Sequence, residues 1–354
     1  MTARIKKTTR ARKVKNIRVA QTLYILKRIL WMIPTLIGIV TITFILVKMR
    51  PDPVSMNAFS AEGMKESSAS EKYMEDMRKY FGDDKPLYVQ YFKTFKNLLT
   101  LDLGTSRIDH KPVTEKIAEA LPITLALNII TIFIVYLISV PLGVFSALND
   151  SSNWDNFVTF ILYLLYSLPS FWVALLLIKY LSGGDYLNLF PLAGLSSVGY
   201  DEFSLWQKWQ DLMWHLFLPI VVSVYGSFAF LSRFIKSSFM EALKSDYIRT
   251  AKAKGMTKRR VVYIHAMRNS LIPLITLMAG ILPELFAGSV IIESIFSIPG
   301  MGKLAFDSIH SNDHAVIIAV VSFSSFLTLL GILMSDIGYT LVDPRISFEK
   351  EEAA

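Results

Sequence analysis

The residues of this chain that could carry out chemistry do not form a catalytic set. Cysteine is absent, which excludes thiolate catalysis, disulfides and cysteine-bound metal. No G-x-x-x-x-G-K-[ST] phosphate loop, H-E-x-x-H pair or G-x-S-x-G motif occurs. The five histidines lack the spacing of metal ligands: His110, His215, His265, His310 and His314. We therefore expect no catalytic, cofactor-binding or metal-binding residues in this chain.

Four carboxylates lie within apolar segments or at their ends: Glu284, Glu293, Asp336 and, just past the last segment, Asp343. Glu284 is near the middle of the segment 271–292, where a charged side chain costs ~3 kcal/mol and usually faces a cavity or a partner. We interpret Glu284 as a candidate for lining a water-filled translocation path, with a buried pairing in the helix bundle as the alternative. Glu293 and Asp336 lie near segment ends, where we expect them to tie loops to helix termini.

A dense excess of positive charge lies in the segment 233–270, between two apolar segments. Two acids, Glu241 and Asp246, oppose ten basic residues: Arg233, Lys236, Lys244, Arg249, Lys252, Lys254, Lys258, Arg259, Arg260 and Arg268. Such an excess is typical of a cytoplasmic loop. The net charge of +8 is concentrated here and at the N-terminus, so nucleic-acid binding is not expected.

The apolar pattern inside this loop predicts two short helices joined by a hinge. Met240, Leu243, Tyr247 and Ala251 recur at spacings of three and four, which favours one helical face. Gly255 can end that helix in the left-handed conformation, and Thr257 suits the N-cap of a second helix. This arrangement would suit docking onto a partner. The alternative is an ordinary basic loop lying on anionic lipid.

Six apolar segments predict an all-α, polytopic membrane protein with six transmembrane helices. They are 29–47, 121–148, 157–181, 216–231, 271–292 and 316–342. The connecting loops 182–215 and 293–315 hold one basic residue each, Lys208 and Lys303, so we expect them outside. The transmembrane domain 121–342 would then be followed by a cytoplasmic tail, 343–354.

The N-terminal segment 1–28 holds ten basic residues and no acid, which predicts a cytoplasmic tail, disordered to about residue 20 and able to meet anionic lipid. A secretory signal peptide is disfavoured because the first apolar segment is too long. Residues 48–120 follow, with amphipathic patterns at Ser70–Phe81, Leu87–Leu99 and Val113–Ala120. They predict a small external helical domain. A lid lying in the membrane interface is the alternative.

Several short motifs lie along residues 26–348: Asp102-Leu-Gly104, Pro112-Val113, Leu121-Pro122, Pro169-Ser-Phe-Trp172, Phe190-Pro-Leu-Ala-Gly194, Pro299-Gly300 and Asp343-Pro-Arg345. Together they resemble the permease subunits of ABC importers in the dipeptide/oligopeptide/nickel family. The basic loop is similar to the EAA coupling loop of that family, although Arg249 replaces its usual glutamate. Within the family, the chain resembles most the Yej-type permeases, linked to oligopeptide and microcin C uptake.

This resemblance implies the partners and the working parts of the chain. It implies a paralogous permease subunit, two ATPase subunits that bind ATP and Mg²⁺, an external solute-binding protein and a peptide substrate, in the bacterial inner membrane. The loop around 246–265 would couple the permease to the ATPases. The residues implied in coupling are Asp246, Tyr247, Arg249, Thr250, Ala251, Gly255, His265, Arg268 and Asn269.

Two other classes of function remain open from the residues alone. An ion-driven secondary transporter or channel would use Glu284 as an ion site. An intramembrane enzyme is disfavoured because the sequence lacks nucleophile and metal motifs.

Overall fold

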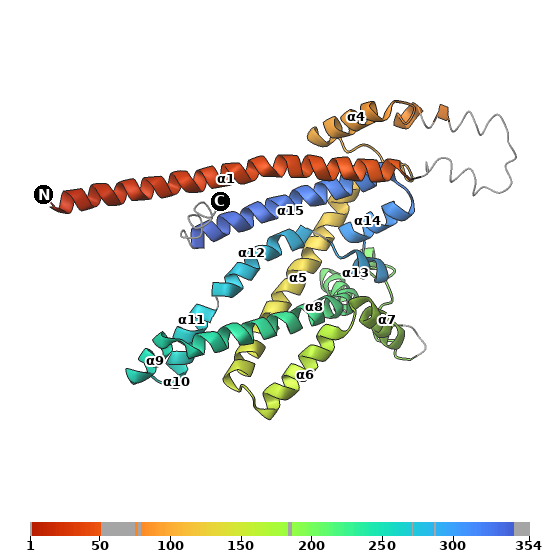
Figure 1. The fold of residues 1–354 in the computed structure, drawn as a ribbon. Helices are drawn as coiled ribbons and strands as arrows, with labels where there is room; N and C mark the ends of the chain where they lie inside the picture. Colours follow the sequence, from red (N-terminus) through yellow and green to blue (C-terminus); the bar gives the residue numbers. More distant parts are fainter. Residues whose placement is uncertain are drawn as a thin grey trace. The chain divides into compact units, whose positions relative to one another are not determined.

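The computed structural model describes residues 2–50, 75–76, 79–182, 186–270, 272–286 and 288–342. Within these ranges the chain is helical, without named strands, and a single isolated bridge pairs Thr105 with Pro112. The chain divides into two compact units, residues 1–120 with 304–354, and residues 121–303. Figure 1 shows the order of the helices.

The first unit is built on two long helices, α1 (Thr2–Lys48) and α15 (His314–Val342), which pack along each other (Figure 1). Phe44 and Val47 of α1 bury their side chains against Ile317 and Ile318 of α15. An ion pair of 3.2 Å joins Arg28 to Asp336, so Asp336 ties two helices together, where the sequence suggested a tie between a loop and a helix end.

Helix α1 starts earlier than the sequence analysis predicted. The basic segment that was expected to be disordered to about residue 20 is helical from Thr2. It contains no Gly or Pro before Pro34, and Lys, Arg and Ala are good helix formers. Nothing in this segment therefore ends the helix.

Helix α4 (Leu87–Leu99) begins and ends where the amphipathic pattern predicted. Its Tyr91 hydroxyl lies 2.8 Å from Thr41 Oγ1, and the Tyr91 ring meets Phe44 edge-on at 5.5 Å. The predicted helix Ser70–Phe81 falls largely outside the described residues, as does the tail 343–354. Gly82, which directly follows Phe81, has φ +74°.

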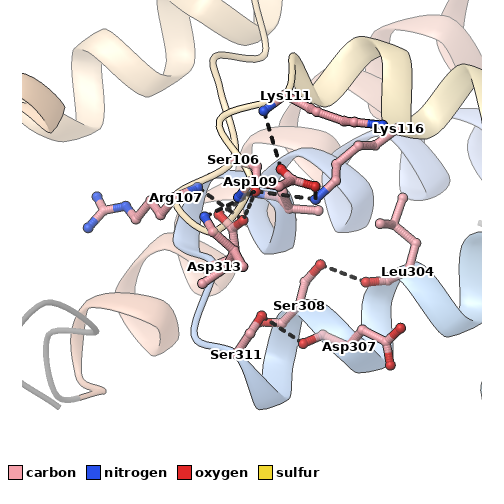
Figure 2. Close-up of polar contacts among 12 residues, drawn as sticks. Ser106, Arg107, Asp109, Lys111, Lys116, Leu304, Asp307, Ser308, Ser311 and Asp313 are labelled. Atoms are coloured by element: carbon pink, nitrogen blue, oxygen red, sulfur yellow. Dashed lines mark hydrogen bonds and ion pairs between the residues drawn. The ribbon is translucent and has the colours of Figure 1, made fainter. Parts of the chain in front are cut away.

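A polar cluster, buried at Ser106 and Asp313, connects the loop before α5 (Val113–Leu148) with the start of α15 (Figure 2). The Asp313 carboxylate accepts hydrogen bonds from the Ser106 hydroxyl and, at 3.1 Å, from the Arg107 N–H. Lys116 forms an ion pair of 2.8 Å with Asp109. Partial burial opposes ionisation, but the Lys116 ammonium and the hydrogen bond from the Lys111 N–H outweigh it and lower the pKa of Asp109 to about 2.

The second unit holds α6 (Asn153–Ser167) and α7 (Ser170–Leu181), which lie at 94° to each other. The sequence analysis predicted one transmembrane helix over 157–181, and the structure instead breaks this segment into two helices. Pro169 disfavours helical dihedrals at Leu168, which is extended, with ψ 127°. The Leu168 carbonyl, which has lost its helical partner, accepts a 2.8 Å hydrogen bond from the Tyr225 hydroxyl.

Helix α8 (Leu205–Lys244) is much longer than the predicted span 216–231. A capping box between Ser204 and Gln207 starts it, and it continues through thirteen buried positions up to Ala242. The predicted fifth span is instead interrupted: α12 covers Ile272–Phe286, and the short α13 covers Val290–Ile295.

By length and composition, four helices among the described residues could cross a membrane: Leu23–Lys48, Val113–Leu148 (α5), Leu205–Lys244 and His314–Gly338. The bent pair α6–α7 makes a fifth if it counts as one span. The last predicted span, 316–342, corresponds closely to α15.

Gly143 of α5 packs so closely on α8 that it has no room for a side chain. A Cβ there would lie 2.7 Å from both Ile235 Cβ and the Ser232 carbonyl oxygen. We predict that Gly143→Ala destabilises the purified protein by about 1–3 kcal/mol through overpacking, measured by thermal unfolding in detergent. Gly226→Ala on α8 is the matched control, because a Cβ added there would meet no atom within 4 Å. The close packing is refuted if both variants unfold at the same temperature.

Candidate functional site

Glu293 is fully buried and anchors the loop between α12 and α14 (Met301–His310). Its carboxylate accepts hydrogen bonds of 3.0 Å from the Thr124 hydroxyl and from the Lys303 N–H. Thr124 accepts in turn from the Met301 N–H at 2.8 Å. These bonds offset the cost of burying the carboxylate and fix α13 to α5. The contacts agree with the structural role that the sequence suggested.

Three glycines allow the backbone to close around this carboxylate. A Cβ on Gly300 would lie 2.5 Å from a Glu293 carboxylate oxygen, and one on Gly302 would lie 2.7 Å from the Val290 nitrogen. On Gly288, a Cβ would meet the Gly302 nitrogen at 2.6 Å. Any larger residue would push the loop off α13.

A cavity of about 730 Å³ lies among α5, α6, α7, α8, α12 and α13. Its polar lining consists of Asn128, Thr131, Tyr136, Tyr166, Ser170, Ser223, Tyr225, Ser227, Glu284 and Ser289. Glu284 is exposed, and it is the one charged side chain among the lining residues. Asn128 donates to the Glu284 and Leu285 carbonyls at 3.2 and 2.9 Å, satisfying acceptors left open at the end of α12.

The basic loop folds into a chain of short elements against the end of α8. Ser245 is extended and separates α8 from α9 (Asp246–Ala253). Gly255 follows with φ +75°, where glycine is favoured. Next come α10 (Lys258–Arg260), the π-helical turn η2 (Val261–Ala266) and α11 (Met267–Ser270).

The loop has a buried apolar side and an exposed basic side. Ile248, Val261 and Ala266 are almost fully buried in a core that includes Phe239 and Ile235 of α8. The exposed basic residues are Lys244, Arg249, Lys252, Lys254, Lys258, Arg259, Arg260 and Arg268. The loop is thus a preformed structure packed on α8, with its charge directed away from the protein.

Comparison with known proteins decides what kind of molecule this is. Residues 139–348 match the family described as the inner membrane component of binding-protein-dependent transport systems. The chain belongs to this family.

Relatives extend the match to nearly the whole chain. The inner membrane ABC transporter permease protein YejB of Escherichia coli O157:H7 is 32% identical, over 92% of this chain and 99% of its own. The oligopeptide transport system permease protein AppB of Bacillus subtilis is 37% identical, again over 92% and 99%. The peptidoglycan transport system permease protein YejB of Agrobacterium fabrum is 32% identical, over 93% and 99%.

The chain is therefore a multi-pass inner membrane permease component of an ABC transporter. Its relatives are transport components, and the family works with ATPase and binding-protein partners. An ion-driven secondary transporter or channel is not favoured.

Most of the residues predicted to take part in coupling are exposed, with two exceptions. His265 is half-buried, and Ala251 is only 4% exposed, in the core against α8. The exposed members are Asp246, Tyr247, Arg249, Thr250, Gly255, Arg268 and Asn269. Glu284 lies apart from them, in the cavity lining.

Two predictions about this loop need correction. The expected continuous face from Met240 to Ala251 is broken at Ser245, so that Ile248 takes the inward position and Tyr247 is exposed. Ala251 packs within its own chain, where it supports α9. Gly255 has the predicted left-handed conformation, and Thr257 occupies the N-cap position without a side-chain hydrogen bond.

The sequence analysis missed a buried ion pair beside this loop. Lys236 of α8 lies 2.6 Å from Asp155, whose side chain is 3% exposed, and 3.1 Å from the more exposed Asp150. The Ser152 side chain caps α6 at the same place. The loop 149–156, which carries no basic residue of its own, is thereby fixed to α8. The sequence held one signal for this pair: the segment 149–156 has acidic but no basic residues, whereas the segment 233–270 has an excess of basic ones.

We predict that Lys236→Met destabilises the permease by about 1–3 kcal/mol, because the Asp155 carboxylate stays buried without its cation. Asp150→Asn should cost less than about 1 kcal/mol, because that pair is exposed. Thermal unfolding in detergent measures both. The double variant Lys236→Met with Asp155→Asn should recover part of the loss. Equal effects of the Lys236 and Asp150 variants would contradict the assignment.

Proposed function

We propose that this permease forms half of the translocation pathway of an ATP-driven peptide importer, coupled to two cytoplasmic ATPase subunits through residues 246–265. The observation that carries the proposal is the two-sided loop. Its apolar side is locked to α8 by Ile248 and Val261, and its basic side is exposed. A loop lying loosely on lipid would not need a buried core of its own.

The same helix connects the loop to the cavity. Lys244, the last residue of α8, adjoins the loop, whereas Val222, Tyr225 and Leu231 of α8 line the cavity. α9 is packed on α8 through Ile248, and α8 is continuous from there to the cavity, so a push on α9 would reach α8 through this packing and then pass along hydrogen-bonded helix. ATPase movement would thus change the cavity that the substrate crosses.

The partners follow from the family and from the charge of the loop. The ATPases would bind ATP and Mg²⁺ and meet the basic surface with acidic groups, and a paralogous permease would complete the pathway. An external binding protein would deliver the substrate. Peptides are favoured because the Bacillus relative is named for oligopeptides and another, from Lactococcus lactis, for dipeptides. A peptidoglycan fragment, after the Agrobacterium relative, is the second candidate.

We further propose six crossings with both termini in the cytoplasm. The interrupted pairs α6–α7 and α12–α13 would each count as one crossing. A small external domain would lie between the first two spans. Charge asymmetry supports this topology: the loop 182–215 holds one basic residue, and 233–270 holds ten.

The natural chain has no cysteine, which makes this topology directly testable. Val198 and Lys258 are exposed in the loops predicted to face opposite sides. In intact spheroplasts, an impermeant maleimide should label Val198→Cys at once and Lys258→Cys only after the membrane is opened. The unsubstituted chain is the blank. Labelling of both variants from outside would refute the topology.

For coupling, we predict that Gly255→Arg abolishes ATP-driven uptake while the protein stays folded in membranes. An arginine at φ +75° costs about 1–2 kcal/mol locally and turns the hinge between α9 and α10. Gly255→Asn is the matched control, because asparagine tolerates this conformation, and it should retain most uptake. The measurement is ATP-dependent peptide uptake by vesicles holding the complete importer. Unchanged transport by Gly255→Arg would disprove the coupling role.

A further inference from the structure

We propose that the cavity contains a subsite for an ammonium group, with Glu284 as its counter-charge. The group would be the N-terminal ammonium of the translocated peptide or a lysine side chain within it. This inference rests on the proposed function and adds the chemical feature of the substrate that this subunit recognises during passage.

The first argument is the charge of the cavity lining. Among the residues that line it, Glu284 is the one ionisable acid or base besides tyrosines. It is exposed, and the ion pairs among the described residues do not involve it. Its charge is therefore not neutralised by the surrounding described helices. A passing cation is attracted to this wall, and an anion is repelled.

The second argument is that the backbone carrying Glu284 is held in place. Asn128 binds the carbonyl oxygens of Glu284 and Leu285 from α5. Just beyond, Ser289 and Ile292 line the same cavity, and the adjacent Glu293 is anchored to Thr124. A carboxylate on a fixed backbone loses little freedom on meeting its partner, which favours recognition.

The third argument is the aromatic lining around the carboxylate. Tyr136, Tyr166 and Tyr225 line the same cavity as Glu284. Tyrosine faces attract ammonium groups, whereas they offer nothing comparable to a carboxylate. The Tyr225 hydroxyl is engaged by the Leu168 carbonyl, so it is not free to bind an anion as a donor.

The place of Glu284 in a cavity lining also explains how its charge is tolerated. At hydrocarbon depth it is tolerated where water or a cation can reach it. A substrate ammonium offers that cation transiently, and the remaining serine and threonine hydroxyls offer weak, unselective contacts along the peptide. The site would thus orient a peptide by its ammonium group while making few selective contacts with the rest of the peptide.

The test compares variant and wild-type uptake rates for three peptides in proteoliposomes holding the complete importer. The peptides are trialanine, N-acetyl-trialanine and N-acetyl-Ala-Lys-Ala. Because each ratio is taken for one peptide, the affinity of the binding protein cancels. Glu284→Gln should slow trialanine about tenfold, as expected for loss of one partly screened charge interaction, and should spare N-acetyl-trialanine. Glu284→Asp should keep most of the rate.

The lysine peptide distinguishes the two sources of the ammonium group. If Glu284→Gln slows this peptide like trialanine, the subsite accepts lysine side chains, and if its uptake is unchanged, the subsite binds only the N-terminus.

Glu241→Gln, which removes an exposed acid of α8 outside the cavity lining, is the charge control. The subsite is overturned if Glu284→Gln leaves trialanine within twofold of wild type, or slows trialanine and N-acetyl-trialanine equally. Failure of the wild type to import trialanine with ATP would instead refute the proposed function and the subsite with it.

Discussion

A carboxylate that is buried away from water must accept hydrogen bonds from its own protein. Glu293 is such a carboxylate, and the second unit is arranged around it. Glu293 takes them from Thr124 of α5 and from the Lys303 N–H at the start of α14. Leaving such a group unpaired would cost several kcal/mol, more than about a third of the stability of a typical domain. The glycines at 288, 300 and 302 make these hydrogen bonds sterically possible, because each lets the chain approach its neighbours more closely than a residue with a Cβ could.

The helices that line the cavity are positioned by this anchored loop. The position of α13 fixes the end of α12, and Asn128 fixes the carbonyls beside Glu284. On the opposite side, the break at Pro169 directs α7 away from α6, and Tyr225 stabilises the opened turn. Both interruptions expose backbone that a membrane does not tolerate in contact with lipid. Their place beside a polar cavity, with side chains satisfying the carbonyls, resolves that conflict.

The basic loop 246–270 depends on a different principle. Its short helices would not be stable alone, and they gain their stability from Ile248, Val261 and Ala266 packed on Phe239. The like charges outside repel one another, so the apolar side must outweigh that repulsion. A partner with acidic groups would relieve it, which makes the docked state electrostatically more favourable than the free one.

Local sequence was sufficient to predict the helical class, the basic loop, the bounds of α4 and the left-handed Gly255. These features depend on periodicity, charge runs and the steric freedom of glycine, all of which act over a few residues. The cost of charge in hydrocarbon also singled out Glu284 as a residue that should face either a cavity or a buried partner, and the structure places it in a cavity lining. The family motifs carried the function, since they combine positions that no single pattern explains.

Which side of each element is buried, by contrast, depends on long-range packing. Ile248 rather than Tyr247 faces inward because the extended Ser245 resets the helical phase between α8 and α9. Asp155 and Lys236 are 81 residues apart, and their pairing depends on the packing of α6 against α8. The tyrosines of the cavity belong to three different helices, whose convergence no local pattern encodes. Local interactions determine which segments form helices, but tertiary contacts determine which helices and side chains pack together.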